Sequence, residues 1–408
     1  MNQSGWYDDT QYGPLPSPES FFGESEFFER LTFRAVLPLA THLSGTIKSL
    51  TLADRVFDLD ALLECLDAAP NLEYLALLNS VPHTFEETAR GFVVSLNRLR
   101  ELNWFQALVC DNVLGTVKLF EHLDMPNLDT AAFALLLDPS KFSPVQLYTP
   151  CTHTVTLFGT TSTITELHLE ASHFMPDKPA RNNIVFHGRR HSPHETLFSV
   201  RVNRCILEAF CDTERISITS SIQINLSHLT HLTFTNKLPY DWNRFFKKSW
   251  FIFLRSVPSV KVLRLYVSEP INILSAISNP EEPCSTSPIT STPILPNLQA
   301  LHLFRCSINS TDSPHDDGDD DAACDVGSIF EGDDDGQSLV HFLQNRADLG
   351  ARIKVIVCTA EDAAAIALNQ PEAFSLVDTI ESSLFPEEVW GEPLFPNRLI
   401  PLLEENLD

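Results

Sequence analysis

Glycine is scarce in this sequence, with 14 residues in a chain of 408. Loops that cradle phosphate groups need closely spaced glycines, so the chain offers little material for a Walker loop or a dinucleotide-binding turn. A Gly-x-Ser-x-Gly nucleophile elbow and a His-Glu-x-x-His zinc helix are also missing. We therefore expect that the chain is not an enzyme, has no catalytic or metal-binding residues, and needs no cofactor.

Long apolar runs are missing as well. No stretch approaches the roughly 18 apolar residues of a transmembrane helix. The first 20 residues are polar and contain proline, without the basic start and apolar stretch of a secretion signal. The nine cysteines are odd in number and lack close paired spacing. These features favour a cytoplasmic or nuclear protein with reduced thiols that does not bind membranes.

Positive charge is the third shortage. The formal net charge is −26, and residues 307–408 contribute −19 of it through 23 acidic and 4 basic side chains. Nucleic acids and anionic membrane surfaces bind to positive potential. We therefore expect that the chain binds neither nucleic acid nor a membrane.

What the sequence does contain is a recurring apolar triplet, in which an aliphatic residue is followed three and five positions later by further apolar residues. The last two members are two apart and so share one face of a strand, and parallel stacking of such strands would bury a continuous core. The copies are Ile47-Leu50-Leu52, Leu72-Leu75-Leu77, Leu99-Leu102-Trp104, Leu128-Ala131-Phe133, Ile164-Leu167-Leu169, Leu197-Val200-Val202, Leu229-Leu232-Phe234, Val260-Leu263-Leu265, Leu298-Leu301-Leu303 and a weaker Ile353-Ile356-Cys358.

Helical periodicity appears between some of these triplets. Apolar spacing predicts helices over 60–69, 84–96 and 241–256, with Pro70 ending the first. The alternation of strands and helices predicts a parallel α/β architecture. The first four copies begin 25, 27 and 29 residues apart, and we interpret the longer later intervals as inserted loops. A non-repeat α/β domain is the alternative.

Three phrases resemble a known family. They are Leu-x-x-x-Pro-Asn-Leu-x-x-Leu-x-Leu at 66–77, Phe-Leu-Arg-Ser-Val-Pro-Ser-Val-Lys-Val-Leu-Arg-Leu at 253–265 and Leu-Pro-Asn-Leu-Gln-Ala-Leu-His-Leu at 295–303. Over about residues 47–358 the chain resembles the leucine-rich-repeat region of fungal F-box-type proteins. The resemblance implies an irregular α/β solenoid of about 9–10 repeats, with parallel strands on its concave face and helices on its convex face.

The same resemblance implies a function. It suggests a non-enzymatic scaffold that recognises substrates for a cullin-RING ubiquitin ligase, with a protein ligand on the concave face and the ligase adaptor as a possible partner. Residues 1–46 show no F-box. The alternative is therefore a free-standing leucine-rich-repeat adaptor or regulator, and a more distant one is an enzyme with an unrecognised site.

The domain organisation follows from these patterns. We expect a disordered polar tail (1–20), an N-terminal helical cap (21–46), the solenoid (47–308), a disordered acidic insert (309–337), and a last repeat with a C-terminal cap (338–408). In the cap, Thr359 should begin a short alanine-rich helix through a capping box.

Three clusters have sharper alternatives. The stretch VFHGRRHSPHE at 185–195 could ligate zinc, but its two arginines and its proline favour a solvated loop. The acidic segment 331–342 begins like a calcium loop, yet Phe342 stands where a glutamate is needed. Bases and aromatics mix at 243–250, as in nucleic-acid stacking surfaces, but helical spacing separates them and favours a core helix.

The expected binding face follows from strand alternation. If Leu50 and Leu52 point into the core, the residues between and beside such pairs point to the opposite face. This face mixes aromatics, imidazoles and both signs of charge, which suits a protein ligand. Its expected partner-binding residues are Tyr74, Glu101, Asn103, Phe105, Glu166, His168, Glu170, Arg201, Asn203, His231, Arg264, Tyr266, His302 and Phe304. The alternative is an ordinary solvated face, with binding elsewhere.

Overall fold

The structure is a computed structural model of the whole chain. It describes residues 29–34, 46–53, 57–78, 80, 82–83, 93–108, 118–137, 155–157, 164–173, 182–190, 195–203, 215–219, 222–236, 253–267, 273–274, 277, 293–304 and 339–383. The expected polar tail at 1–20 and acidic insert at 309–337 lie outside these residues.

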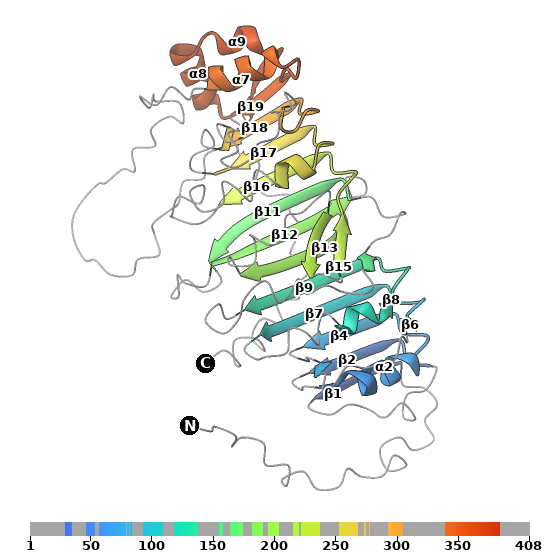
Figure 1. Cartoon of the computed structure of the whole chain (residues 1–408). Coiled ribbons are helices and arrows are strands. Elements are labelled where there is room, and N and C mark those ends of the chain that lie inside the picture. Colours follow the sequence, from blue (N-terminus) through green and yellow to red (C-terminus); the bar gives the residue numbers. More distant parts are fainter. Residues whose placement is uncertain are drawn as a thin grey trace, which may run out of the picture.

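A single 13-stranded sheet dominates the fold, and Figure 1 shows its strands stacked like the rungs of a ladder. In spatial order its strands are β1 (Arg30–Arg34), β2 (Ser49–Ala53), β4 (Tyr74–Leu78), β7 (Glu101–Leu108), β9 (Thr130–Leu137), β13 (Glu195–Asn203), β12 (Asn182–Arg190), β11 (Glu166–His173), β16 (His231–Asn236), β17 (Val262–Tyr266), β18 (Ala300–Phe304), β19 (Val355–Cys358) and β20 (Thr379–Ser382). Neighbouring strands are parallel, except that β12 runs antiparallel to both β11 and β13. The expected α/β class with a mostly parallel sheet is confirmed.

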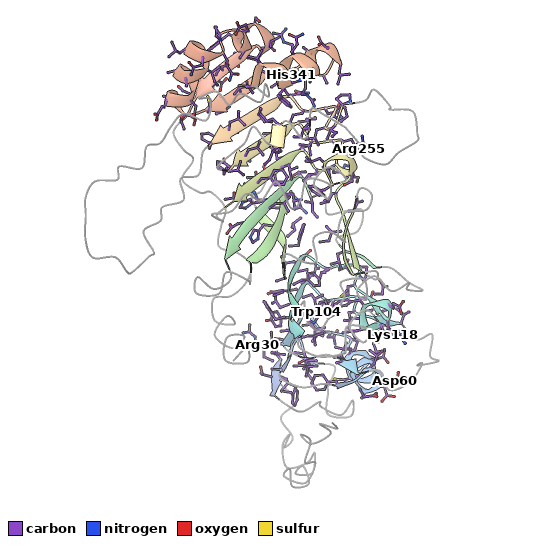
Figure 2. The ribbon with its side chains drawn as sticks, turned by 60° about the vertical axis from the view of Figure 1, so that its left-hand side comes forward. Arg30, Asp60, Trp104, Lys118, Arg255 and His341 are labelled. Atoms are coloured by element: carbon purple, nitrogen blue, oxygen red, sulfur yellow. The ribbon has the colours of Figure 1, made fainter. Side chains whose placement is uncertain are left out.

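Smaller elements lie beside this sheet. Strand β3 (Phe57–Asp58) pairs with β5 (Pro82–His83), β6 (Val94–Ser95) pairs with β8 (Leu123–Asp124), and β15 (Ile222–Asn225) joins β10 (Val155–Leu157) to β14 (Arg215–Thr219). Helix α2 (Leu59–Asp67) contacts β3, β5 and β6. Figure 2 shows Asp60 of α2 and Arg30 of β1 on opposite sides of the sheet.

The core lies on the sheet face that carries Leu50 and Leu52, called here the inner face. The apolar triplets are buried wherever their side chains are described, with exposures of 3% or less. Trp104 packs between Phe120 and Phe133, with ring centroids 4.9 and 6.0 Å from its own. The alternation in the sequence predicts this burial. The buried side chains of the strands belong to one hydrophobic core.

A hydrogen-bonded turn recurs before many strands. The amide of Leu99 donates to the carbonyl of Leu96 at 3.1 Å, and the amide of Leu298 donates to that of Leu295 at 3.0 Å. A polar side chain in such a turn often reaches the preceding turn. Asn127 Nδ2 donates to the carbonyl of Asn97 at 2.8 Å, and Ser259 Oγ donates to that of Ser227 at 3.0 Å.

A second contact recurs where each strand begins, because one carbonyl accepts two consecutive amides of the neighbouring strand. Thus the carbonyl of Lys261 accepts from Gln299 at 2.8 Å and from Ala300 at 3.0 Å. Among the described residues the same double acceptance is made by the carbonyls of Glu29, Lys48, Glu73, Arg100, Thr165, Thr230, Gln299 and Lys354. The strand starts are therefore held in line along the sheet.

The expected helices have different outcomes. The one at 60–69 is confirmed as α2, where the Asp58 side chain accepts from the amide of Ala61 at 3.0 Å. Within the expected helix at 84–96, Val94–Ser95 is instead strand β6, because buried Val94 pairs with Leu123 across a two-stranded ladder. Of the helix expected at 241–256, the structure describes 253–256, which are helical.

The expected helical cap at 21–46 is wrong where it is described. Arg30–Arg34 forms β1, which pairs in parallel with β2. The physical reason is a pattern of alternation, since Leu31 and Phe33 pack against the core beside Leu50 and Leu52. The first described strand of the sheet therefore precedes the first apolar triplet.

The strand order around β12 also differs from expectation. Successive triplets were expected on adjacent strands, but β13 pairs with β9, while β11 pairs with β16. A solvated loop was expected at 185–195, but residues 185–190 belong to β12, which lies between β13 and β11. Phe198 and Val200, rather than Val200 and Val202, align with Ala131 and Phe133.

Two contacts explain why β12 belongs in the sheet. Arg189 Nε donates to Glu166 Oε2 at 2.5 Å, and both side chains are at least 90% buried. Gly188 pairs with Phe198, whose ring occupies the space where a Cβ at Gly188 would stand. The ion pair of Arg189 and the small size of Gly188 therefore allow β12 to lie between β11 and β13.

At the C-terminal end lie α7 (Leu339–Asp348), α8 (Ala360–Asn369) and α9 (Ala373–Leu376). The capping prediction at Thr359 is confirmed, since its hydroxyl accepts from the amide of Asp362 at 3.1 Å. Strand β20 extends the sheet beyond the last expected strand. Among the described residues, no helix is both long and apolar enough to cross a membrane.

Candidate protein-binding face

The face opposite the core, called here the outer face, carries the expected binding residues in rows that run across the strands. One row joins Asn103, His168, Arg264 and His302 through directly paired positions on successive strands. A row on one side of it contains Tyr74, Glu101, Glu166 and His231, and a row on the other contains Phe105, Glu170, Arg201, Tyr266 and Phe304. On β13, Asn203 follows Arg201 by two positions and therefore lies on the same face of the sheet.

Sharing a face does not make these residues equally accessible. Glu101 is exposed, whereas six others are half-buried, namely Tyr74, Glu170, His231, Arg264, Tyr266 and His302. Five are buried, namely Asn103, Phe105, Glu166, His168 and Phe304. The side chains of Arg201 and Asn203 lie outside the described part. Neighbouring strands are only about 4.8 Å apart, so side chains of one row cover each other.

The first polar cluster lies near the N-terminal end of the face. The Asn103 amide donates to Tyr74 Oη at 3.2 Å and to Glu101 Oε1 at 2.9 Å. Burial raises the pKa of Tyr74, the hydrogen bond from Asn103 lowers it, and the Glu101 carboxylate raises it. Tyr74 therefore stays a neutral phenol at neutral pH and presents its half-buried ring beside an exposed carboxylate.

The second cluster surrounds β12 in the middle of the sheet. Besides the Glu166–Arg189 pair, His168 Nε2 lies 2.8 Å from Thr235 Oγ1. The rings of His168 and His187 have centroids 5.9 Å apart. Sequence reasoning missed Arg189 and His187 as members of this face. The apolar run Ile184–Phe186 before Gly188 was the available signal for a strand.

The third cluster lies on β16, β17 and β18, with Arg264 at its centre. Tyr266 stacks on Phe304, with ring centroids 5.3 Å apart and an interplanar angle of 13°. Burial, the positive charge of Arg264 and the His231 ring together lower the pKa of His302 to about 4. His302 is therefore neutral at neutral pH, and Arg264 is the fixed positive charge of this cluster.

No group of three or more histidine, cysteine, aspartate or glutamate side chains is placed to hold a metal ion within the described ranges. Searches with protein-family models and with curated protein sequences found no match to this chain.

Proposed function

We propose that the chain is a non-enzymatic protein-binding scaffold, built as an irregular leucine-rich-repeat solenoid. The recurring turn before the strands and the carbonyls that accept two amides support the repeat. They fix each unit on the preceding one, as expected of a fold in which every repeat packs on its neighbours. The reversed order of β11, β12 and β13 is the main irregularity.

The observation that carries the proposal is the alignment of the outer face. Residues from strands far apart in the chain fall into rows across the sheet, so the sheet presents one wide surface. Aromatic rings, imidazoles and charges of both signs alternate along it. Such a mixture, with aromatic anchors among polar groups, is typical of protein–protein interfaces.

The link to ubiquitin ligases is the narrower form of this proposal. It rests on resemblance, which implies a recognition subunit that delivers substrates to a cullin-RING ligase. The place of Arg30–Arg34 favours the free-standing alternative, because these residues form a strand of the large sheet rather than a separate adaptor-binding helix.

Affinity purification with mass spectrometry tests both forms. The full chain is compared with a Glu101→Lys/Tyr266→Ala variant of the outer face and with a Glu64→Lys control on α2, whose side chain is exposed. We expect the outer-face variant to lose protein partners that the control keeps. Recovery of a cullin adaptor with the wild type supports the ligase form. Identical partners for all three proteins contradict the assignment of the outer face.

A further inference from the structure

The cluster on β16, β17 and β18 forms a grid of nine outer-face positions, called here the Arg264 patch. Arg264 occupies the centre, and Thr233 and His302 are its direct cross-strand partners. The grid consists of His231, Thr233, Thr235, Val262, Arg264, Tyr266, Ala300, His302 and Phe304. None of these nine residues is acidic, although the chain carries 54 acidic against 28 basic side chains.

The other residues of the Arg264 patch do not neutralise the charge of Arg264. No carboxylate of the described residues forms an ion pair with it. Arg100 and Arg189 differ, because Arg100 pairs with Asp129 at 2.9 Å and Arg189 pairs with Glu166. The positive field of Arg264 also reaches its neighbour, since it helps to lower the pKa of His302.

A half-buried guanidinium with no counter-ion among the described residues is poorly compensated, because it has lost part of its hydration. Its planar donors match a carboxylate, which can accept two parallel hydrogen bonds. The half-buried ring of Tyr266, which stacks on the buried ring of Phe304, lies directly beside it and provides an apolar surface. A ligand that satisfies both features carries a carboxylate next to an apolar group.

Acidic side chains limit the extent of this patch. On β11, the half-buried Glu170 lies two strands away from Arg264, and on β20 Glu381 lies three strands away on the other side. A nucleic acid needs several cations along its backbone and would meet these carboxylates instead. A short acidic peptide needs only the central cation.

We propose that the Arg264 patch binds an acidic segment of a partner protein, with a partner carboxylate on Arg264 and an adjacent apolar side chain on Tyr266. The charge complementarity is local, since the rest of this acidic chain repels such a segment. The inference rests on the proposed protein-binding function and specifies the chemistry of the partner at one site.

Binding of synthetic peptides to the full-length protein tests the patch. The probe is a fluorescent peptide of alternating glutamate and leucine, and its control contains glutamine in place of glutamate. Fluorescence anisotropy compares wild type, Arg264→Gln, Arg264→Lys and Arg30→Gln. Arg30 is the matched control, because it is an exposed arginine on the same sheet at its far end. Circular dichroism melting verifies that each variant is folded.

We expect the wild type to bind the acidic peptide at least about tenfold more tightly than the glutamine peptide, and Arg264→Gln to remove this preference. Arg264→Lys should retain part of it, because lysine keeps the charge without the planar donors. Arg30→Gln should bind as the wild type does. Added salt should weaken binding of the acidic peptide and leave the glutamine peptide unaffected.

Several results would overturn the inference. The first is equal affinity of the wild type for the two peptides. The second is unchanged affinity of folded Arg264→Gln for the acidic peptide, or a loss of affinity in Arg30→Gln as large as that in Arg264→Gln. The third is binding of a single-stranded oligonucleotide that is tighter than binding of the acidic peptide and depends on Arg264. The proposed function is judged separately. If the outer-face variant loses its cellular partners while Arg264→Gln binds the acidic peptide normally, the scaffold proposal stands and the acidic-segment proposal fails.

Discussion

Arg346 on α7 donates a hydrogen bond of 2.9 Å to the carbonyl oxygen of Leu295, 51 residues earlier in the chain. The same guanidinium donates to the carbonyl of Ile294 at 2.7 Å and to that of Ala351 at 3.1 Å. Leu295 has a φ of 52°, in the left-handed region that costs energy for a residue other than glycine. Arg346 therefore fixes the strained turn before β18 to the C-terminal helices.

The first prediction concerns this arginine. Arg346 is 2% exposed, so Arg346→Met should leave buried carbonyls without donors. We expect a loss of about 3 kcal/mol in the free energy of unfolding, from about 1 to 3 kcal/mol for each unsatisfied group. Urea unfolding followed by circular dichroism measures it. The control Arg98→Met, at an exposed arginine, should change stability by less than about 0.5 kcal/mol. Equal losses of stability in the two variants would contradict the role of Arg346 in holding the turn before β18.

The second prediction concerns the buried pair Glu166–Arg189. Arg189→Met alone should destabilise the protein by about 3 to 5 kcal/mol, because the Glu166 carboxylate stays buried without its partner. Glu166→Gln together with Arg189→Met should be less harmful than the sum of the two single changes. A double-mutant cycle of unfolding free energies measures the coupling. If the losses of unfolding free energy of the two single variants simply add in the double variant, the two side chains do not interact, which would contradict the position of β12 in the sheet.

The third prediction concerns Gly188. A methyl group there would overlap the buried ring of Phe198, so Gly188→Ala should destabilise the protein by about 1 to 3 kcal/mol. Phe198→Leu in the same chain should restore part of the loss by making space. Thermal unfolding of the two single variants and the double variant measures this rescue. A neutral Gly188→Ala is incompatible with the packing of β12 on β13.

The fourth prediction concerns the pH dependence of stability. The pKa of His302 is about 4 in the folded protein, against an ordinary value of 6.5. The unfolded chain therefore binds this proton first as the pH falls, and the folded state loses stability between about pH 6.5 and pH 4. The full effect is about 3 kcal/mol, which partial exposure reduces to about 2 kcal/mol.

A variant isolates the contribution of His302 from that of other titrating groups. His302→Gln should show a smaller drop in unfolding free energy between about pH 7 and pH 4 than the wild type does. Chemical unfolding at a series of pH values gives the two curves. Parallel curves would show that His302 titrates normally in the folded state.

The fifth prediction concerns the thiols of Cys65 and Cys358. Burial raises the pKa of Cys65 to about 12, and burial together with the Asp362 carboxylate raises that of Cys358 to about 12. Only the thiolate reacts with alkylating reagents, so neither should be modified in the native protein at neutral pH. Peptide mass spectrometry after iodoacetamide treatment measures this, with protein unfolded in urea as the control. Rapid native labelling of either cysteine would contradict its burial.

The sequence by itself determined which residues enter the core and which share the outer face. Strand alternation is a local property, so the pairs Leu50–Leu52 and Leu263–Leu265 could be assigned to the inner face without knowing their neighbours. The same alternation gives the positions of the outer-face residues, including Arg264. Local capping chemistry likewise predicted the start of α8 at Thr359.

Only the tertiary structure decided which strands are neighbours and which outer-face residues remain accessible. Glu166 and Arg189 are 23 residues apart, and their pairing depends on the hairpin that puts β12 between β11 and β13. Alternation assigns a face to each residue but not a partner strand, because pairing depends on contacts between distant segments. For the same reason the sequence could not show that Phe105 is buried, that Glu101 is exposed, or that Arg264 has no acidic neighbour in its grid.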